Sequence, residues 1–195
     1  VTALRLAESG RDVLVLERGR DYRDRDFPRD PTDVESLFWR GARDRGLYDL
    51  RFLSALGVVA ASGLGGGSLV YANIHVRPDD AVFDDSRWPR AITRRALDPY
   101  FDRVASMLGL APPPAGLRMP KRDAFHRAAA ALGRQVFEPD MAVAWASSPG
   151  PGRLPCQLAA DCEFGCTHGA KQSLDVTYLA AAESRGATLR TRAFV

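Results

Sequence analysis

The sequence lacks any hydrophobic run long enough to cross a membrane. Its longest apolar stretch, from Ala55 to Ala61, is interrupted by Gly57 and is far shorter than the ~20 residues of a spanning helix. Cysteine is also scarce. Three cysteines in 195 residues, with no secretory signal before them, are not a disulfide framework. We therefore expect a protein without a membrane span that resides in the reducing cytoplasm.

Charge of one sign is not concentrated in any part of the chain. The net charge is +3, yet the most charged segment, 11–51, contains ten arginines and ten acidic residues. No basic stripe with interleaved aromatic residues occurs, which argues against nucleic acid as a partner. The content of 46% hydrophobic and 26% charged residues is typical of a globular protein.

The chain opens with the pattern of the second half of a βαβ unit. Residues 1–9 have helical spacing, Gly10 suits a helix end, and the apolar run within 12–17 predicts a strand buried on both faces. Glu17 ends that strand, where a Rossmann unit places an acid on the ribose hydroxyls. A carboxylate there would repel a 2′-phosphate, which favours FAD or NAD over NADP.

The glycine-rich turn that normally precedes such a helix is missing, because the chain begins at Val1 within the helix. The other end, Val195, follows directly on an apparent strand. We therefore expect a piece of a longer protein, cut at both ends.

Further elements are predicted between these ends. They are a charged loop at 18–36, short strands within 47–61, a strand at 74–76, a helix at 93–108 with Thr93 as N-cap and a kink or break at Pro99, a linker at 112–114, a helix at 123–132 ended by Gly133, a weak strand at 135–145, a loop at 149–169, a helix at 174–184 and a strand at 187–195.

Four glycines lie in the five positions 63–67, followed by Ser68. A backbone without Cβ atoms can adopt positive φ angles and approach a flat ring or a phosphate closely. No Lys-Ser/Thr pair follows, so this is not a P-loop. The apolar run Leu69–Tyr71 predicts a buried, fixed loop rather than a flexible turn.

With these motifs the sequence resembles the glucose–methanol–choline (GMC) oxidoreductases, in particular the branch that contains cholesterol oxidases. The matching segments follow one another in the order of the family and cover nearly the whole chain. They are Ala3–Ala7 through Val15–Gly19, Gly63–Val70, Trp88–Pro89 with Leu97–Phe101, Gly165–Lys171 and Asp175–Leu179.

The resemblance implies an α/β fold, a partial FAD-binding Rossmann-like (doubly wound) domain with the start of the substrate domain. Residues 1–110 would form the FAD-binding region, 111–155 a linker and substrate-domain insertion, and 156–195 the cysteine loop and the return to the FAD-binding domain. The implied chemistry is oxidation of an alcohol by hydride transfer to flavin N5, with oxygen, a dye or a redox partner as acceptor.

The resemblance also assigns cofactor-binding residues. Glu17 would hold the adenosine ribose, Asn73 would lie near the isoalloxazine, and the Val195 backbone would meet the adenine. The flavin and pyrophosphate would be lined by Gly63, Gly65, Gly66, Gly67 and Ser68. Some relatives carry a flavin-linked histidine where this chain has Val70, so non-covalent FAD is expected.

The resemblance implies no catalytic residue in this chain, because the family's catalytic histidine and its partner, a histidine or an asparagine, lie in a C-terminal half that the resemblance does not cover. His75, His126 and His168 are interpreted as surface or structural residues, none paired with a second acid or base. The residues that shape a substrate pocket are mostly missing, so the alcohol cannot be identified.

Cys156, Cys162 and Cys166 are spaced C-x5-C-x3-C, with His168 two residues further on. Relatives carry a four-cysteine version, in which Ala159 would be the second cysteine. Three thiolates would suit a three-iron cluster that exports electrons, and zinc is a second alternative. The third is a tight loop with buried structural cysteines.

Two other classes of function stay open from the residues. Glu17 alone would permit an NAD-binding Rossmann enzyme, although that leaves the glycine loop unexplained. The cysteine loop alone would permit a metal-binding module that is not an enzyme.

Overall fold

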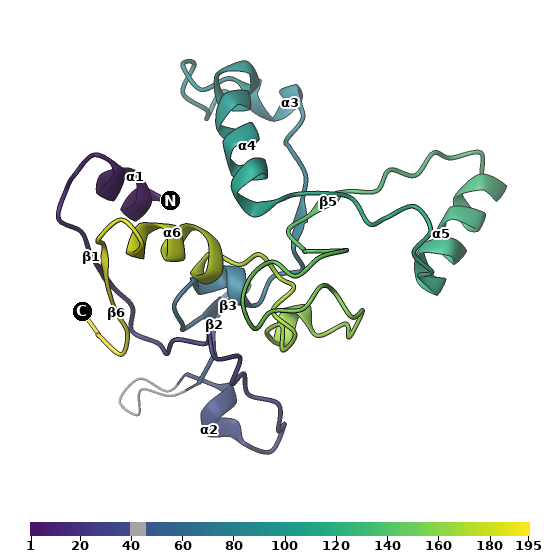
Figure 1. Ribbon diagram of the computed structural model, residues 1–195. Helices are drawn as coiled ribbons and strands as arrows, with labels where there is room; N and C mark the ends of the chain where they lie inside the picture. The colour runs from purple at the N-terminus through teal and green to yellow at the C-terminus, as the bar shows by residue number, and fades with distance from the viewer. Residues whose placement is uncertain (40–45) are drawn as a thin grey trace.

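The computed structural model describes residues 1–39 and 46–195 (Figure 1). The helices are α1 (Thr2–Glu8), α2 (Val34–Leu37), α3 (Asp80–Phe83), α4 (Arg94–Leu108), α5 (Pro120–Ala131) and α6 (Ala180–Glu183). Shorter turns are η2 (Gly66–Leu69), η3 (Cys162–Phe164) and the π-helical η4 (Asp175–Leu179). The strands are β1 (Leu14–Leu16), β2 (Tyr48–Leu53), β3 (Leu56–Ala61), β4 (Ile74–His75), β5 (Asp140–Met141) and β6 (Thr188–Arg190).

The two ends of the chain meet in a parallel pair of strands. β1 runs beside β6, with Val15 opposite Leu189, and α1 packs against α6 and η4 (Figure 1). This helix–strand order confirms the α/β character of the predicted N-terminal unit. The predicted burial of its strand is wrong, because Leu14 and Leu16 are 53% and 44% exposed on the open face of a two-stranded sheet.

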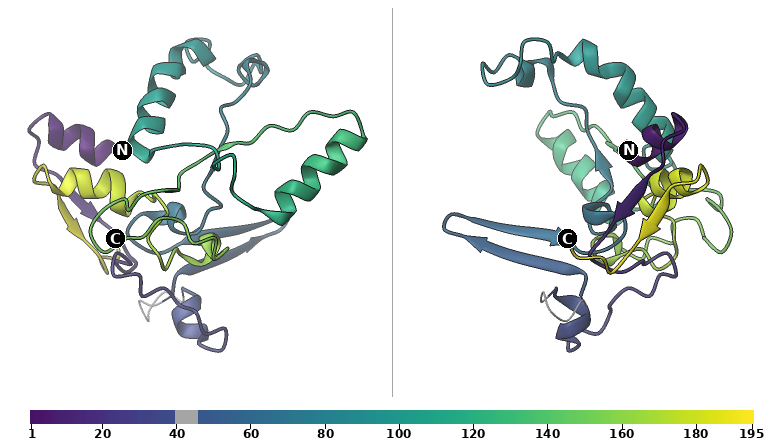
Figure 2. Two further views of the ribbon diagram at one scale, coloured as in Figure 1. Left: turned by 45° about the vertical axis from the view of Figure 1, so that its right-hand side comes forward. Right: turned by 90° about the vertical axis from the view of Figure 1, so that its left-hand side faces the viewer.

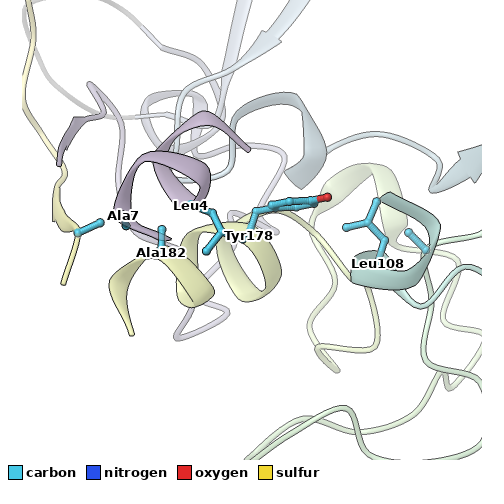
Figure 3. Packing of buried hydrophobic residues seen from close by; sticks show 7 residues of the cluster. Leu4, Ala7, Leu108, Tyr178 and Ala182 are labelled. Atoms are coloured by element: carbon cyan, nitrogen blue, oxygen red, sulfur yellow. The ribbon is translucent and has the colours of Figure 1, made fainter. Parts of the chain in front are cut away.

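The main hydrophobic cluster joins the N-terminal helix to the C-terminal one. Leu4 and Ala7 of α1 meet Tyr178 of η4 and Ala182 of α6, and Leu108 at the end of α4 closes the cluster (Figure 3). All five side chains are buried, so α1, α4 and the C-terminal helix are fixed relative to one another.

The strands predicted within 47–61 form one antiparallel hairpin. β2 pairs with β3 from Tyr48 opposite Ala61 to Leu53 opposite Leu56. The hairpin projects from the body, and Phe52 near its tip is 84% exposed (Figure 2). Only its base, where Asp49 is buried, belongs to the interior.

Helix α4 follows the predicted 93–108 closely. The Thr93 side chain accepts a hydrogen bond from the Ala96 amide, and Gly109 ends the helix in a left-handed conformation. The predicted break at Pro99 is absent, since one helix runs from Arg94 to Leu108. The charged loop predicted at 18–36 includes the start of α2, where Asp33 caps the helix through the Ser36 amide.

Residues 112–139 form an extension that we call the arm, with α5 set apart from the other helices (Figures 1 and 2). Helix α5 begins at Pro120, three residues earlier than predicted, because proline suits the first turn. Gly133 follows its end in a left-handed conformation, as expected. No residue of α5 is buried.

Three predicted elements are shorter or different in the structure. The weak strand at 135–145 is limited to β5, which pairs with β4. The helix at 174–184 begins as the π-helical η4 before α6. The strand at 187–195 is limited to β6, because the backbone turns to a positive φ at Arg192.

Among the residues that the structure describes, no helix combines the length and the hydrophobicity needed to cross a bilayer.

Candidate functional site

Glu17 lies just past the carboxyl end of β1, as predicted. Its amide donates to Arg190 O at 2.9 Å, and its carbonyl accepts from the Ala193 amide at 2.9 Å. The carboxylate accepts from the Gly19 amide at 2.7 Å. This leaves further acceptor positions on a half-exposed carboxylate, which is what ribose hydroxyls would require.

The glycine loop has two positions where a Cβ would be crowded, Gly63 and Gly65, and two where it would meet open space, Gly66 and Gly67. A Cβ on Gly63 would come within 2.8 Å of Leu69 and 2.9 Å of Tyr22. Gly65 has a φ of +112°, and a Cβ there would lie 3.3 Å from Asp175. Gly66 also has a positive φ. Gly67 has no positive φ, and a Cβ added to it would meet no heavy atom within 4 Å. The described residues therefore give no internal reason for glycine at 67.

The Ser68 hydroxyl ties this loop to the C-terminal segment. It donates to Gly65 O at 2.7 Å and accepts from the Leu174 amide at 2.9 Å. The hydroxyl is thus engaged inside the protein, which favours a role in shaping the loop.

Asn73 is completely buried and has a left-handed backbone, with a φ of +65°. Its carbonyl accepts from the Ala142 amide at 2.9 Å. Neither side-chain amide atom has a hydrogen bond of ordinary geometry to any residue in 1–39 or 46–195. The side chain nevertheless interacts with the Cys162 thiol and lies in the wall of the cavity that the cysteines line, so it faces the cysteine loop.

Among the described residues, no hydrogen bond joins Val195 to the glycine loop. Val195 is 95% exposed, two residues beyond the bond between Ala193 and Glu17. The structure therefore places Val195 on the Glu17 side of the candidate site.

The three cysteines surround one small cavity of about 20 Å³, which also has Asn73 and Lys171 in its wall. That volume suits roughly one water molecule. The thiols are unpaired, and burial raises the pKa of Cys156 and Cys162. Within the described residues no group of three or more His, Cys, Asp or Glu side chains is placed to hold a metal ion. The metal hypothesis stays a prediction.

Lys171 is the residue that the sequence reasoning missed. It is 3% exposed, and its ammonium donates to Leu69 O at 3.0 Å, Tyr71 O at 2.8 Å and Cys162 O at 2.7 Å. Burial lowers its pKa to about 8. The signal that could have found it is its rarity, as one of only two lysines in an arginine-rich chain, together with its place in the Gly165–Lys171 motif.

We call residues 62–73 together with residues 153–175 the loop junction. It is held by the side chains of Lys171, Ser68 and Arg153. Arg153 is half-buried and donates to Gly169 O at 2.8 Å and Lys171 O at 3.0 Å. Asp175 lies beside Gly65, and burial raises its pKa. The junction is thus fixed largely by charged side chains that bind backbone atoms.

The histidines differ partly from expectation. His75 lies 3.0 Å from the Tyr71 hydroxyl, and burial lowers its pKa. His126 does pair with an acid, Glu138 at 3.0 Å, so the prediction that no histidine has such a partner is wrong. That pair is on the surface of the arm, far from the glycine loop in the fold (Figure 1).

Comparison with known proteins places this geometry in context. The model of the GMC oxidoreductase family matches residues 53–195. A cholesterol oxidase of Mycobacterium tuberculosis is 31% identical over 96% of this chain, which is 36% of the relative. A cholesterol oxidase of Acinetobacter baumannii is 28% identical over 96% of this chain and 37% of its own length. An uncharacterised GMC-type oxidoreductase of M. tuberculosis is 27% identical over 97% of the chain. The chain spans about a third of the length of these curated relatives.

Proposed function

Because the chain belongs to the GMC oxidoreductase family, whose cofactor is FAD, we propose that it forms the FAD-binding part of an alcohol-oxidising enzyme. The observation that carries this proposal is the glycine at 67, where the described residues leave open space around a Cβ and no positive φ requires glycine. A flat or anionic group against Gly67 would explain why no side chain is present there.

The proposed roles follow the positions of the residues. Glu17 accepts hydrogen bonds from the adenosine ribose, and the Val195 backbone lies on the adenine side. The pyrophosphate and flavin lie along Gly63, Gly65, Gly66, Gly67 and Ser68, with Asn73 at the isoalloxazine. Nothing in these roles requires a covalent bond to the cofactor, since Val70 stands at the position of the flavin-linked histidine.

FAD, when bound, supplies the two-electron acceptor: the carbinol hydrogen leaves as hydride, the hydroxyl proton goes to a base, and a carbonyl remains. The part of the chain described here orients the acceptor and shields it from water. Since the chain spans about a third of its relatives' length, we propose that the base and most of the substrate pocket come from residues outside it.

We propose a lipophilic alcohol as the substrate, with oxygen as acceptor. Two relatives are named cholesterol oxidase, so a sterol is the first alcohol to test. An apolar hollow of about 300 Å³ beside the cysteine loop supports this class, because Met141, Trp145 and Leu158 line it.

The test compares two glycines of similar surroundings in the complete protein. Gly67 and Gly116 both have open space around a Cβ and no positive φ. Gly67→Val should lower FAD affinity by at least about tenfold, whereas Gly116→Val should leave it unchanged, because a branched side chain obstructs a ligand only at 67. Fluorescence titration measures affinity, and thermal melting checks that both variants fold. Normal FAD affinity in Gly67→Val would contradict the proposed site.

A second candidate is a dehydrogenase that exports electrons through a three-iron cluster on Cys156, Cys162 and Cys166. It is favoured by the fact that all three cysteines line one cavity. As placed they do not fit a cluster, because about 20 Å³ is too small and two thiols have raised pKa values. Iron analysis of anaerobically purified protein decides: about three irons per FAD would support the cluster, and none would remove it.

A further inference from the structure

All three N–H donors of the Lys171 ammonium are used in hydrogen bonds to backbone carbonyls. An ammonium has three N–H donors, and the structure provides three acceptors within 3.0 Å. The Nζ atom also lies 4.8 Å from the centre of the Tyr71 ring, a distance that favours a cation–π contact. The buried charge is therefore fully compensated, and it holds main chain rather than another side chain.

The carbonyls belong to two segments that are far apart in sequence. Leu69 and Tyr71 leave the glycine loop, and Cys162 belongs to the cysteine loop. Backbone acceptors cannot change rotamer, so a single ammonium between them fixes the path of both segments. An apolar residue of similar size could fill the same space, but it could not set this path.

The segment held in this way ends at Asn73. Its start is held by the Ser68 hydroxyl, which accepts from the Leu174 amide, three residues after Lys171. Segment 171–174 thus binds segment 68–71 twice, through the Lys171 ammonium and through the Leu174 amide. Asn73 follows directly, and its carbonyl accepts a hydrogen bond from the Ala142 amide, so these contacts together fix the backbone from the glycine loop to Asn73.

We propose that Lys171 is a positioning residue for FAD, which acts by clamping Leu69 and Tyr71 to Cys162 and so fixes the backbone of the glycine loop that would lie against the flavin. The inference rests on the proposed FAD site. The side chain itself is buried beneath the loop and does not touch the cofactor. A clamp of this kind lowers the entropy that the loop would lose on binding, so its removal weakens binding and alters the surroundings of the ring.

The experiment uses the complete, FAD-loaded protein and three variants. Lys171→Met keeps the length of the side chain but removes its three donors, and Lys171→Arg keeps a cation. Arg127→Met is the control, because Arg127 is a cation exposed on α5 of the arm. The measurements are FAD affinity by fluorescence titration, the visible circular dichroism of bound flavin, its midpoint potential, and the melting temperature.

Lys171→Met should weaken FAD binding by about tenfold or more and change the flavin dichroism, with partial restoration in Lys171→Arg. The control should match the wild type in all four measurements. If Lys171→Met melts earlier yet binds FAD with unchanged affinity, dichroism and potential, Lys171 is only a structural residue and the proposal is wrong.

If Lys171→Met fails to fold, Lys171→Gln, which keeps two donors, replaces it and is judged by the same results. A wild-type protein that binds no flavin would instead overturn the proposed function, and the two failures are therefore distinguishable.

Discussion

The loop junction and the arm are built on opposite principles. In the junction, buried charged and polar side chains bind backbone atoms of distant segments, as Lys171 does with Leu69 and Cys162. In the arm, α5 has no buried residue, and Phe125 and Leu132 are 66% and 75% exposed. The side-chain contacts described within the arm, such as Arg122 with Leu117 O and His126 with Glu138, join residues close in sequence, whereas those of the junction join distant segments. The following experiments test that contrast.

The largest difference is expected between two left-handed glycines. Gly65→Ala should destabilise the fold by about 3 kcal/mol, because a positive φ and contacts with Leu69 and Asp175 act together. Gly133→Ala on the arm has a positive φ but open space, so it should cost about 1 kcal/mol. Urea unfolding of both variants measures the free energies. Equal losses would show that the junction is not more tightly packed than the arm.

An intermediate effect is expected for buried and exposed arginines. Arg153→Met should cost about 2 kcal/mol, since Gly169 O and Lys171 O lose a charged donor in a half-buried place. Arg127→Met on the exposed face of α5 should change stability by less than about 0.5 kcal/mol. The same unfolding measurement applies. A loss in Arg127→Met as large as in Arg153→Met would contradict the contrast.

The smallest expected effect is a gain in stability, for the variant Asp175→Asn. Burial raises the pKa of Asp175, so stability falls as pH rises from the ordinary value near 3.9 through the raised folded value, and stays lower above it. Asp175→Asn removes this penalty. The variant should be more stable than the wild type at pH 7, by less than the losses above, and equal to it below about pH 4. Melting curves from pH 3 to 8 measure this. A difference that does not change with pH would exclude the carboxylate as its cause.

The same contrast explains how much could be predicted from the sequence. Helix α4 was predicted nearly to the residue, because its start and end depend on local groups, the Thr93 hydroxyl and Gly109. The strands within 47–61 were predicted in position, but their pairing into one antiparallel hairpin was not. The α/β order at the N-terminus was also recognisable, whereas a doubly wound sheet stays a prediction.

The candidate site was only partly predictable. The glycine loop and Glu17 have local signatures, and the structure places both in backbone settings that suit a ligand. The partners of Lys171 lie about a hundred residues away at Leu69 and Tyr71, so no local pattern reveals them. Likewise, the π-helical turn at Asp175–Leu179 has the same apolar spacing as an α-helix, and only packing distinguishes the two.

The pairing of β1 with β6 has a consequence for how the chain folds. Val15 lies opposite Leu189, so nearly the entire chain forms the loop that this pair closes. The entropy lost in closing such a loop grows with its length, and contacts of high sequence separation form slowly. During synthesis, β1 and the adjoining Glu17 wait without their partner strand until residues 188–190 have left the ribosome. The corner that would receive the ribose therefore forms later than local elements such as the β2–β3 hairpin, because it requires two strands that are far apart in the sequence.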